Sequence, residues 1–239
     1  MNWYDYLSYG PTGWGDELLA GLAVTAALAL TTLPFGLLGG FLVAAAAVSP
    51  STALRNSALF FTTTIRGLPE LLSLFIIYHG AGMLINHTIK WLNPEAGFFE
   101  LSPFVAGTVA LSLVFAGYSA EVLRGAWQAL DRGQREAALA IGMTRWQAFR
   151  RIELIQILRL ALPGLGNLWI NLIKDTALVS VIALNDLMRM ANVAVGVTKK
   201  PFLFFITVCL IYWLICLLFE FLLSALEKRA NRGHFKQQI

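Results

Sequence analysis

Long apolar runs constrain this chain more than any other feature of its sequence. Five of them stand out, at about residues 18–48, 58–86, 103–123, 154–184 and 202–226. Each reaches the roughly 20 residues that an α-helix needs to cross a hydrocarbon layer about 30 Å thick. Only 13% of the residues are charged, which is about half the share found in soluble domains. The chain is therefore expected to fold in a membrane.

A bundle of helices is the fold class that follows. Lipid offers no partner to unpaired backbone groups, and the alternating pattern of a membrane β-barrel is absent from the chain. We expect an all-α, polytopic bundle of about five transmembrane helices, with residues 1–239 forming one domain. Pro34 and Pro69 predict kinks in the first two spans. The fourth span is expected to tilt or unwind where polar residues interrupt it, namely at Asn167, Asn171, Lys174 and Asp175.

The basic residues are divided unequally between the two ends of these spans. One side carries Arg55, Arg66, Arg124, Arg132, Arg135, Arg145, Arg150, Arg151, Lys228, Arg229, Arg232 and Lys236. The other side carries only Lys90, Arg189, Lys199 and Lys200. Because lysine and arginine accumulate in cytoplasmic connections, we expect the N-terminus outside and the C-terminus in the cytoplasm. An odd number of spans agrees with that orientation.

The largest polar connection, at about residues 125–153, has the pattern of two short helices joined by a turn. Residues 136–141 are good helix formers, and Gly142 readily adopts the left-handed conformation that closes a helix. Thr144 and Gln147 then have the spacing of a capping box, which predicts the start of a second helix.

Two interpretations of this segment remain open on physical grounds. Leu139, Met143 and Trp146 fall at i, i+4 and i+7, so one side is apolar, and a compact helical projection of this kind fits a groove on a soluble partner. Glu136 then places a charge near the helix start. The alternative is an interfacial loop whose arginines hold the topology and bind anionic lipid headgroups.

Four blocks of sequence carry a resemblance to a known family. Glu136, Ala137 and Ala138, followed by Gly142 and Ile152, resemble the EAA loop of permease subunits of bacterial binding-protein-dependent ABC importers. The segments IRGLPELLSLF at 65–75, GYSAEVLRGA at 117–126 and LIKDTALVSVIAL at 172–184 are similar to stretches of its polar amino-acid branch. That branch includes histidine, lysine-arginine-ornithine and opine permeases. One departure is Ile155, which stands where the family usually has proline and leaves the angle between loop and span less fixed.

The resemblance implies a permease subunit of the bacterial inner membrane that takes up polar amino acids, a cationic one or an opine being favoured. Its implied partners are an ABC ATPase dimer, a periplasmic or extracellular substrate-binding protein and a second permease, for which a different homologous chain is preferred and a second copy of this chain is the alternative. The implied ATPase-coupling residues are Glu136, Ala137, Ala138, Gly142, Met143 and Arg145. ATP and Mg are expected in the partner ATPase, because this chain has no G-x-x-x-x-G-K-[ST] loop. We expect no enzymatic activity and no cofactor in the chain itself.

Polar side chains within the spans are candidates for the translocation path. Asn167, Asn171 and Lys174 follow helical spacing on the fourth span; the alternative is that such asparagines bond neighbouring helices. Lys174 and Asp175 point about 100° apart on a helix, so each is expected to find another partner. Glu70 and Glu121 either attract a cationic substrate or, the safer interpretation, pair with Arg66 or Arg124.

Two other functions compete with the importer. An ion-coupled secondary transporter would use Lys174, Asp175 and Glu121 as a relay, but no inverted repeat supports it. A membrane-embedded enzyme lacks a nucleophile with its base, and His79, His87 and His234 lack metal-ligand spacing.

Overall fold

The computed structural model of the protein describes residues 3–10, 13–95 and 97–231, and over these residues every regular element is helical. Arg232, His234 and Lys236 lie outside the described residues. In chain order the elements are α1 (Trp3–Leu7), α2 (Gly15–Ala47), α3 (Thr52–Gly67), α4 (Glu70–Leu92), α5 (Pro103–Gln128), α6 (Arg132–Ala140), α7 (Arg145–Ala148), the π-turn η1 (Phe149–Glu153), α8 (Leu154–Asp175), the 3-10 helix η2 (Thr176–Ile182), α9 (Leu187–Thr198) and α10 (Pro201–Ala230).

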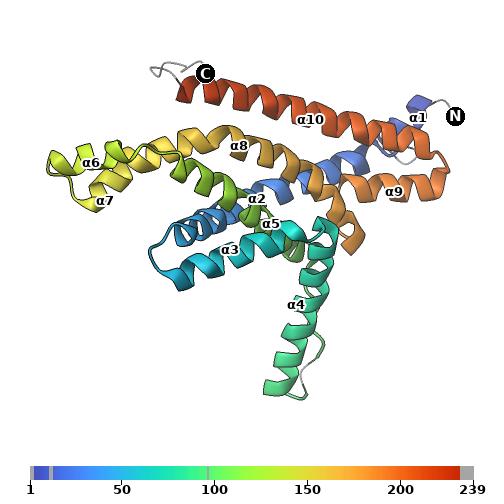
Figure 1. Ribbon diagram of the computed structural model, residues 1–239. Coiled ribbons are helices and arrows are strands. Elements are labelled where there is room, and N and C mark those ends of the chain that lie inside the picture. Colours follow the sequence, from blue (N-terminus) through green and yellow to red (C-terminus); the bar gives the residue numbers. More distant parts are fainter. Residues whose placement is uncertain (1–2, 11–12, 96, 232–239) are drawn as a thin grey trace.

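Five helical stretches of the described chain are long and apolar enough to cross a membrane, as the sequence predicted. They are Gly15–Ala47, Glu70–Leu92, Pro103–Gln128, Arg145–Ile182 and Pro201–Ala230. Because the number of crossing stretches is odd, α1 and the end of α10 lie at opposite ends of the molecule (Figure 1). Pro34 lies inside α2, which continues as one helix on both sides of it.

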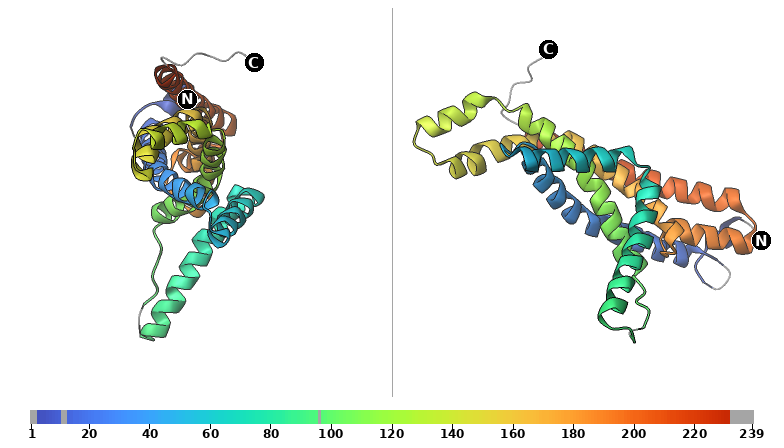
Figure 2. Two further views of the ribbon diagram at one scale, coloured as in Figure 1. Left: turned by 60° about the vertical axis from the view of Figure 1, so that its left-hand side comes forward. Right: turned by 60° about the horizontal axis from the view of Figure 1, so that its bottom comes forward.

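The predicted second span, 58–86, is wrong, because the chain breaks in its middle. α3 ends at Gly67, Leu68 is extended with φ −96° and ψ 142°, and α4 begins only after Pro69. A residue before proline is pushed away from helical angles, and proline itself cannot donate to a helix, so the break replaces the expected kink. α4 then leaves the bundle at a steep angle, and all the views in Figures 1 and 2 agree on this. The crossing helix is therefore Glu70–Leu92 alone.

The chain returns from α4 along a braced segment. The Asn86 amide donates to the Phe99 carbonyl at 2.8 Å, and its oxygen accepts the Phe99 N–H at 2.8 Å. Because both backbone groups of Phe99 are satisfied by one side chain, this irregular segment stays attached to α4 without forming a strand.

The fourth span stays α-helical through Asn167, Asn171, Lys174 and Asp175, where unwinding was expected, and changes to a 3-10 helix only after them. α8 ends at Asp175, and η2 continues to Ile182 before Ala183 adopts a left-handed φ of 65°. At its other end, Ile155 lies within regular helix, and η1 joins α7 to α8 without a break. Since isoleucine keeps the N–H that proline lacks, the helical path passes through the position where the family usually has proline.

Close packing of α2 on α5 forms the centre of the bundle. Gly36 and Gly40 lie four residues apart on α2, and both are buried. A Cβ on Gly36 would come within 2.8 Å of the Phe115 ring, and one on Gly40 would overlap the Ser119 hydroxyl. Small residues at this spacing let two membrane helices approach closely, which is favourable where lipid gives no hydrophobic driving force between them.

We predict that Gly40→Val disturbs this crossing, because the added side chain must displace Ser119 or part the helices. Overpacking of this kind costs about 1–3 kcal/mol, which corresponds to roughly 2–12 °C in the melting temperature of a protein of this size. The measurement is thermal unfolding of the detergent-solubilised protein. Gly80→Val on α4 is the matched control, because a Cβ there meets nothing within 4 Å. Equal melting temperatures for the two variants would show that the α2–α5 contact does not limit stability.

Candidate functional site

Residues 132–153, comprising α6, α7 and η1, form a compact projection at one end of the molecule, here called the knob (Figure 1). Asp131 caps α6, its carboxylate accepting the Gly133 N–H at 2.8 Å. α6 closes at Gly142, whose φ is +88° as predicted. Met143 N–H donates to the Ala138 carbonyl at 3.1 Å and Gly142 N–H to the Leu139 carbonyl at 3.0 Å. These two bonds define a Schellman closure, which turns the chain sharply at the glycine.

The second helix of the knob begins with the predicted capping box. The Thr144 hydroxyl accepts the Gln147 N–H at 3.3 Å, and the Gln147 side chain accepts the Thr144 N–H at 2.9 Å. The two bonds satisfy donors that a helix start leaves without partners, so a helix of only four residues is held in place.

The predicted coupling residues lie on the surface of the knob with one exception. Glu136, Ala137, Gly142 and Arg145 are exposed, Met143 is half-buried, and Ala138 is buried. Large apolar side chains are exposed beside them, with Ile141 at 75% and Trp146 at 65%. An apolar patch rimmed by charged side chains marks an interaction surface. Ile141 was missed by the sequence argument, although it directly precedes the turn glycine.

A cavity of about 270 Å³ lies between the start of α4, α5 and α8. Its polar lining comes from Glu70, Tyr118, Asn171 and Asp175, and its apolar lining from Leu111, Val114, Phe115, Leu168 and Leu172. The Glu70 and Asp175 carboxyls both line this cavity. Two carboxylates in one cavity repel each other, so a bound cation stabilises the pair. The cavity is therefore suited to a positively charged group.

Of the candidate path residues, the structure brings three together and separates three. Glu70, Asn171 and Asp175 line the cavity, whereas Asn167 and Lys174 are exposed outside it. The predicted divergence of Lys174 and Asp175 is confirmed, because only Asp175 faces the cavity. Glu121 does not line the cavity either.

The sequence argument missed the α5 wall of the cavity. Leu111, Val114, Phe115 and Tyr118 contribute this wall, and they fall at i, i+3, i+4 and i+7. That spacing predicts one helix face. The last residue of this face, Tyr118, carries a hydroxyl and lies one turn before Glu121. This polar group on an otherwise apolar face was the sequence feature that could have indicated the wall of the cavity.

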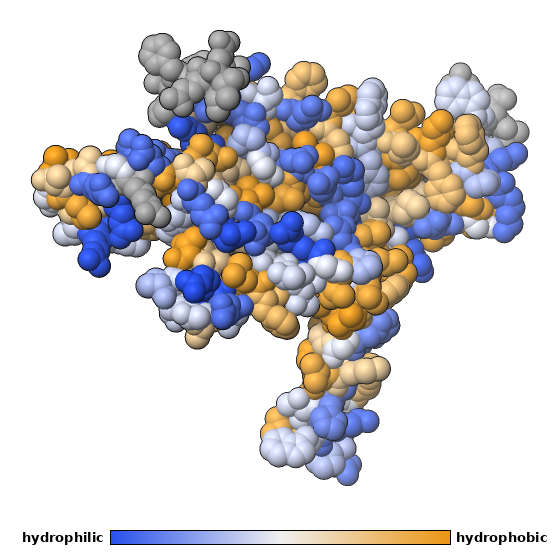
Figure 3. Space-filling view, viewed as in Figure 1, coloured by the Kyte–Doolittle hydropathy of each residue, from blue (hydrophilic) through white to orange (hydrophobic). Residues whose placement is uncertain are grey.

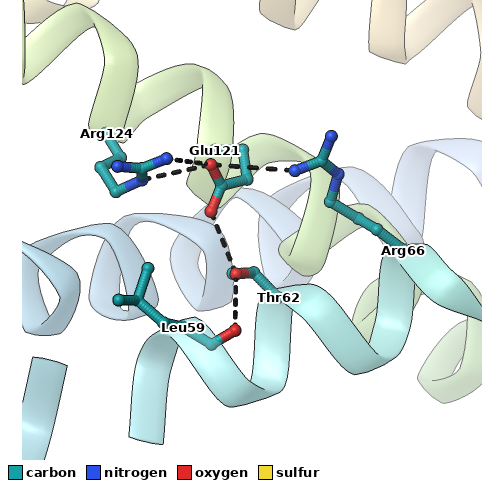
Figure 4. A network of polar contacts seen from close by, with 5 residues as sticks. All are labelled: Leu59, Thr62, Arg66, Glu121 and Arg124. Carbon is teal, nitrogen blue, oxygen red and sulfur yellow. Dashed lines mark hydrogen bonds and ion pairs between the residues drawn. The ribbon is translucent and has the colours of Figure 1, made fainter. Parts of the chain in front are cut away.

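Glu121 instead forms the centre of a network of charged contacts (Figure 4). Its Oε2 accepts from Arg124 Nη2 at 2.6 Å and Nε at 3.1 Å, and lies 3.8 Å from Arg66 Nη1. Its Oε1 lies 3.0 Å from the Thr62 hydroxyl, whose proton is shared with the Leu59 carbonyl at 3.2 Å. The expected pairing with Arg66 or Arg124 is thus confirmed for Glu121. For Glu70 it is wrong: within the described residues Glu70 forms no ion pair with either arginine, and it lines the cavity together with Asp175.

Hydrophilic residues also form a band across the middle of the face that Figure 3 displays, between the knob and α4, while much of the α10 side is hydrophobic. Arg66, Thr63 and Thr64 on α3 are exposed. Polar groups at membrane depth are stable only against protein or water. This face is therefore unsuited to lipid, in contrast to α10.

The chain is similar to several known proteins in sequence and in structure. Residues 36–232 match the family described as binding-protein-dependent transport system inner membrane component. The octopine transport system permease protein OccQ of Agrobacterium tumefaciens (strain Ach5) is 40% identical over 233 residues, covering 98% of each chain. The arginine ABC transporter permease protein ArtQ of Escherichia coli (strain K12) is 38% identical, over 89% of this chain and 93% of its own. A solved amino acid ABC transporter with histidines is 33% identical, with a TM-score of 0.76 over 90% of this chain and 95% of its own.

We predict that Glu121→Ala destabilises the protein by about 1–3 kcal/mol, because the partly buried Arg124 loses the acceptor of its charged hydrogen bonds. Arg66→Ala is expected to cost at most about 1 kcal/mol, since Arg66 is half exposed and its contact is 3.8 Å long. Melting of both variants in detergent is the measurement. An equal loss of stability in the two would contradict a network centred on Glu121 and Arg124.

Proposed function

The chain belongs to the family of binding-protein-dependent transport system inner membrane components, and from this premise we propose that it carries a cationic amino acid or an opine. Members of this family are multi-pass permease subunits of ATP-driven importers in the bacterial inner membrane. The chain is accordingly a transport component without ATPase activity. ATP and Mg are bound by a separate ATPase subunit, which operates with a binding protein and a pair of permeases.

The observation that carries the substrate proposal is the pair of acids in the cavity. Glu70 and Asp175 give the cavity two carboxyls with no basic residue in its lining. A guanidinium, ammonium or imidazolium group bound between them relieves their repulsion and gains charged hydrogen bonds. Asn171 and Tyr118 add neutral donors and acceptors for the rest of the ligand. The relatives named for octopine and arginine support the same class.

We propose that the knob faces the cytoplasm and docks into the ATPase. The basic residues of 132–151 and of the end of α10 lie at one end of the molecule, which supports an external N-terminus and a cytoplasmic C-terminus. The proposed contact residues are Glu136, Ala137, Ala138, Gly142, Met143 and Arg145. Each of these residues except Ala138 has exposed surface that a partner can contact. Ala138 is buried and supports α6 from beneath.

The second permease, in this proposal, covers the polar face of α3 and the open side of the cavity. Asn167 and Lys174 are exposed on a membrane-crossing helix. Such groups require protein or water around them. We assign them to the translocation route between the two permeases, with Glu70, Asn171 and Asp175, and Glu121 to its structural support. The resemblance to two-permease amino-acid systems favours a different, homologous chain as the partner.

We predict that Asp175→Asn and Glu70→Gln slow uptake of labelled arginine by roughly ten- to hundredfold, because each removes a charged hydrogen-bond acceptor worth about 1.5–3 kcal/mol. The measurement is ATP-driven uptake into proteoliposomes that hold the permease pair, the ATPase and the binding protein. Glu220→Gln is the matched control, a neutralised carboxyl on a membrane-crossing helix that does not line the cavity. Wild-type uptake by Asp175→Asn would refute the binding role.

We also predict that Gly142→Val and Glu136→Lys uncouple ATP hydrolysis from uptake without impairing membrane insertion. Valine strongly resists the φ of +88° at Gly142, so the turn must deform. The tagged chain is purified in mild detergent, and recovery of the ATPase is compared with ATP hydrolysed per substrate imported. Gly125→Val, at an open position on α5, is the control. Normal coupling in both variants would exclude the knob as the docking element.

A further inference from the structure

We propose that four aromatic rings carry the movement of the knob to α2 and α5, and that Phe149 and Trp127 are positioning residues for coupling. The rings belong to Trp146, Phe149, Trp127 and Phe41, and we call them the aromatic bridge. The inference rests on the proposed docking of the knob to an ATPase and deepens it, because it names the route by which a push on the knob reaches the membrane spans.

The bridge is continuous from the knob into the bundle. The ring centroids of Trp146 and Phe149 are 5.8 Å apart, with an angle of 30° between the planes. Phe149 stacks on Trp127 at 5.5 Å and 22°. Trp127 in turn stacks on Phe41 at 6.4 Å and 29°. All three separations fall within the range in which aromatic pairs attract each other. The series thus joins α7, η1, α5 and α2 in turn.

The three inner rings are partly buried against the core of the bundle. Phe41, Trp127 and Phe149 pack against a buried cluster composed of Ala44, Ala120, Leu123, Ala126, Ile157 and Ala161. Close-packed interiors have low compressibility, so a displaced ring must displace its neighbours. The bridge therefore transmits a displacement instead of absorbing it.

Polar contacts, here called the tether, also join α6 to η1 and to the first turn of α8. Arg135 Nε lies 3.5 Å from Glu153 Oε1, and Glu153 is almost fully buried. Gln156 donates to Gln134 at 3.3 Å beside this pair. Phe149 and Glu153 are the two ends of the same π-turn, η1. π-turns of this kind occur frequently at functional sites. The tether fixes α6 to the start of α8, so the knob moves as one body and the aromatic bridge receives that movement.

The open end of the bridge distinguishes it from an ordinary packing cluster. Trp146 is 65% exposed, and Ile141 of the same knob is 75% exposed. A ring that serves only stability gains most when it is buried on all sides. Here the terminal ring instead presents its free surface at the place where the ATPase is proposed to dock.

The test uses the reconstituted complex of permease pair, ATPase and binding protein. Phe149→Leu and Trp127→Leu keep an apolar side chain but remove the ring. Energetic coupling through such networks is modulated by about 0.5–2 kcal/mol, so substrate imported per ATP should fall roughly two- to thirtyfold. The ATPase should still co-purify, and its hydrolysis rate should persist. Phe149→Tyr, and the exchange Phe149→Trp with Trp127→Phe, retain stacked rings and should preserve coupling.

Phe221→Leu is the matched control, because Phe221 is 74% exposed on α10 and has no part in the bridge. Unchanged import per ATP in both leucine variants would overturn the inference while leaving the proposed function intact. Equal loss in the leucine variants and in Phe149→Tyr would also overturn it, because stacking would then not be the property that matters. A wild-type chain that retains no ATPase would overturn the proposed function, and the inference with it.

Discussion

The close crossing of α2 and α5 is the contact on which the rest of the structure depends. Gly36 and Gly40 let α5 approach until Phe115 and Ser119 fill the gap. From that position α5 supplies one wall of the cavity, the Glu121 carboxylate and the Trp127 ring. Lipid cannot drive apolar helices together, so shape complementarity at this crossing has to do so. One helix therefore sets the geometry of the cavity, the ion network and the aromatic bridge together.

The carboxylates on these helices lie in two opposite environments. At Glu121 the carboxylate is surrounded by Arg124, Arg66 and Thr62, so its charge is neutralised within the chain (Figure 4). At Glu70 and Asp175 two acids share a cavity whose lining holds no counter-charge. Two like charges in one cavity repel each other, and a bound cation would relieve that repulsion. The same residue type is thus structural in one place and suited to binding in the other.

What the sequence predicted well was local. The turn at Gly142 and the capping box of Thr144 and Gln147 each depend on residues within one or two turns. The division of residues 58–86 was missed because apolar character alone cannot distinguish a kink from a break at Pro69. Which residues line the cavity depends on how the start of α4 lies relative to α8, and the two are about 100 positions apart in the chain. A local sequence pattern does not predict such an arrangement.

Side-chain contacts hold the junction between the knob and the bundle. With Ile155 in place of the usual proline, the backbone N–H at this position is retained and helix continues through it. Rigidity that proline would have supplied at one residue is then supplied by side chains. The Arg135–Glu153 pair of the tether joins α6 to the end of η1, and the stack of Phe149 on Trp127 joins η1 to α5. Because these contacts act on opposite ends of a single π-turn, they restrain its rotation as well as its translation. A proline fixes one dihedral angle, whereas the stack of Phe149 on Trp127 and the Gln134–Gln156 hydrogen bond join the knob to two membrane helices, α5 and α8.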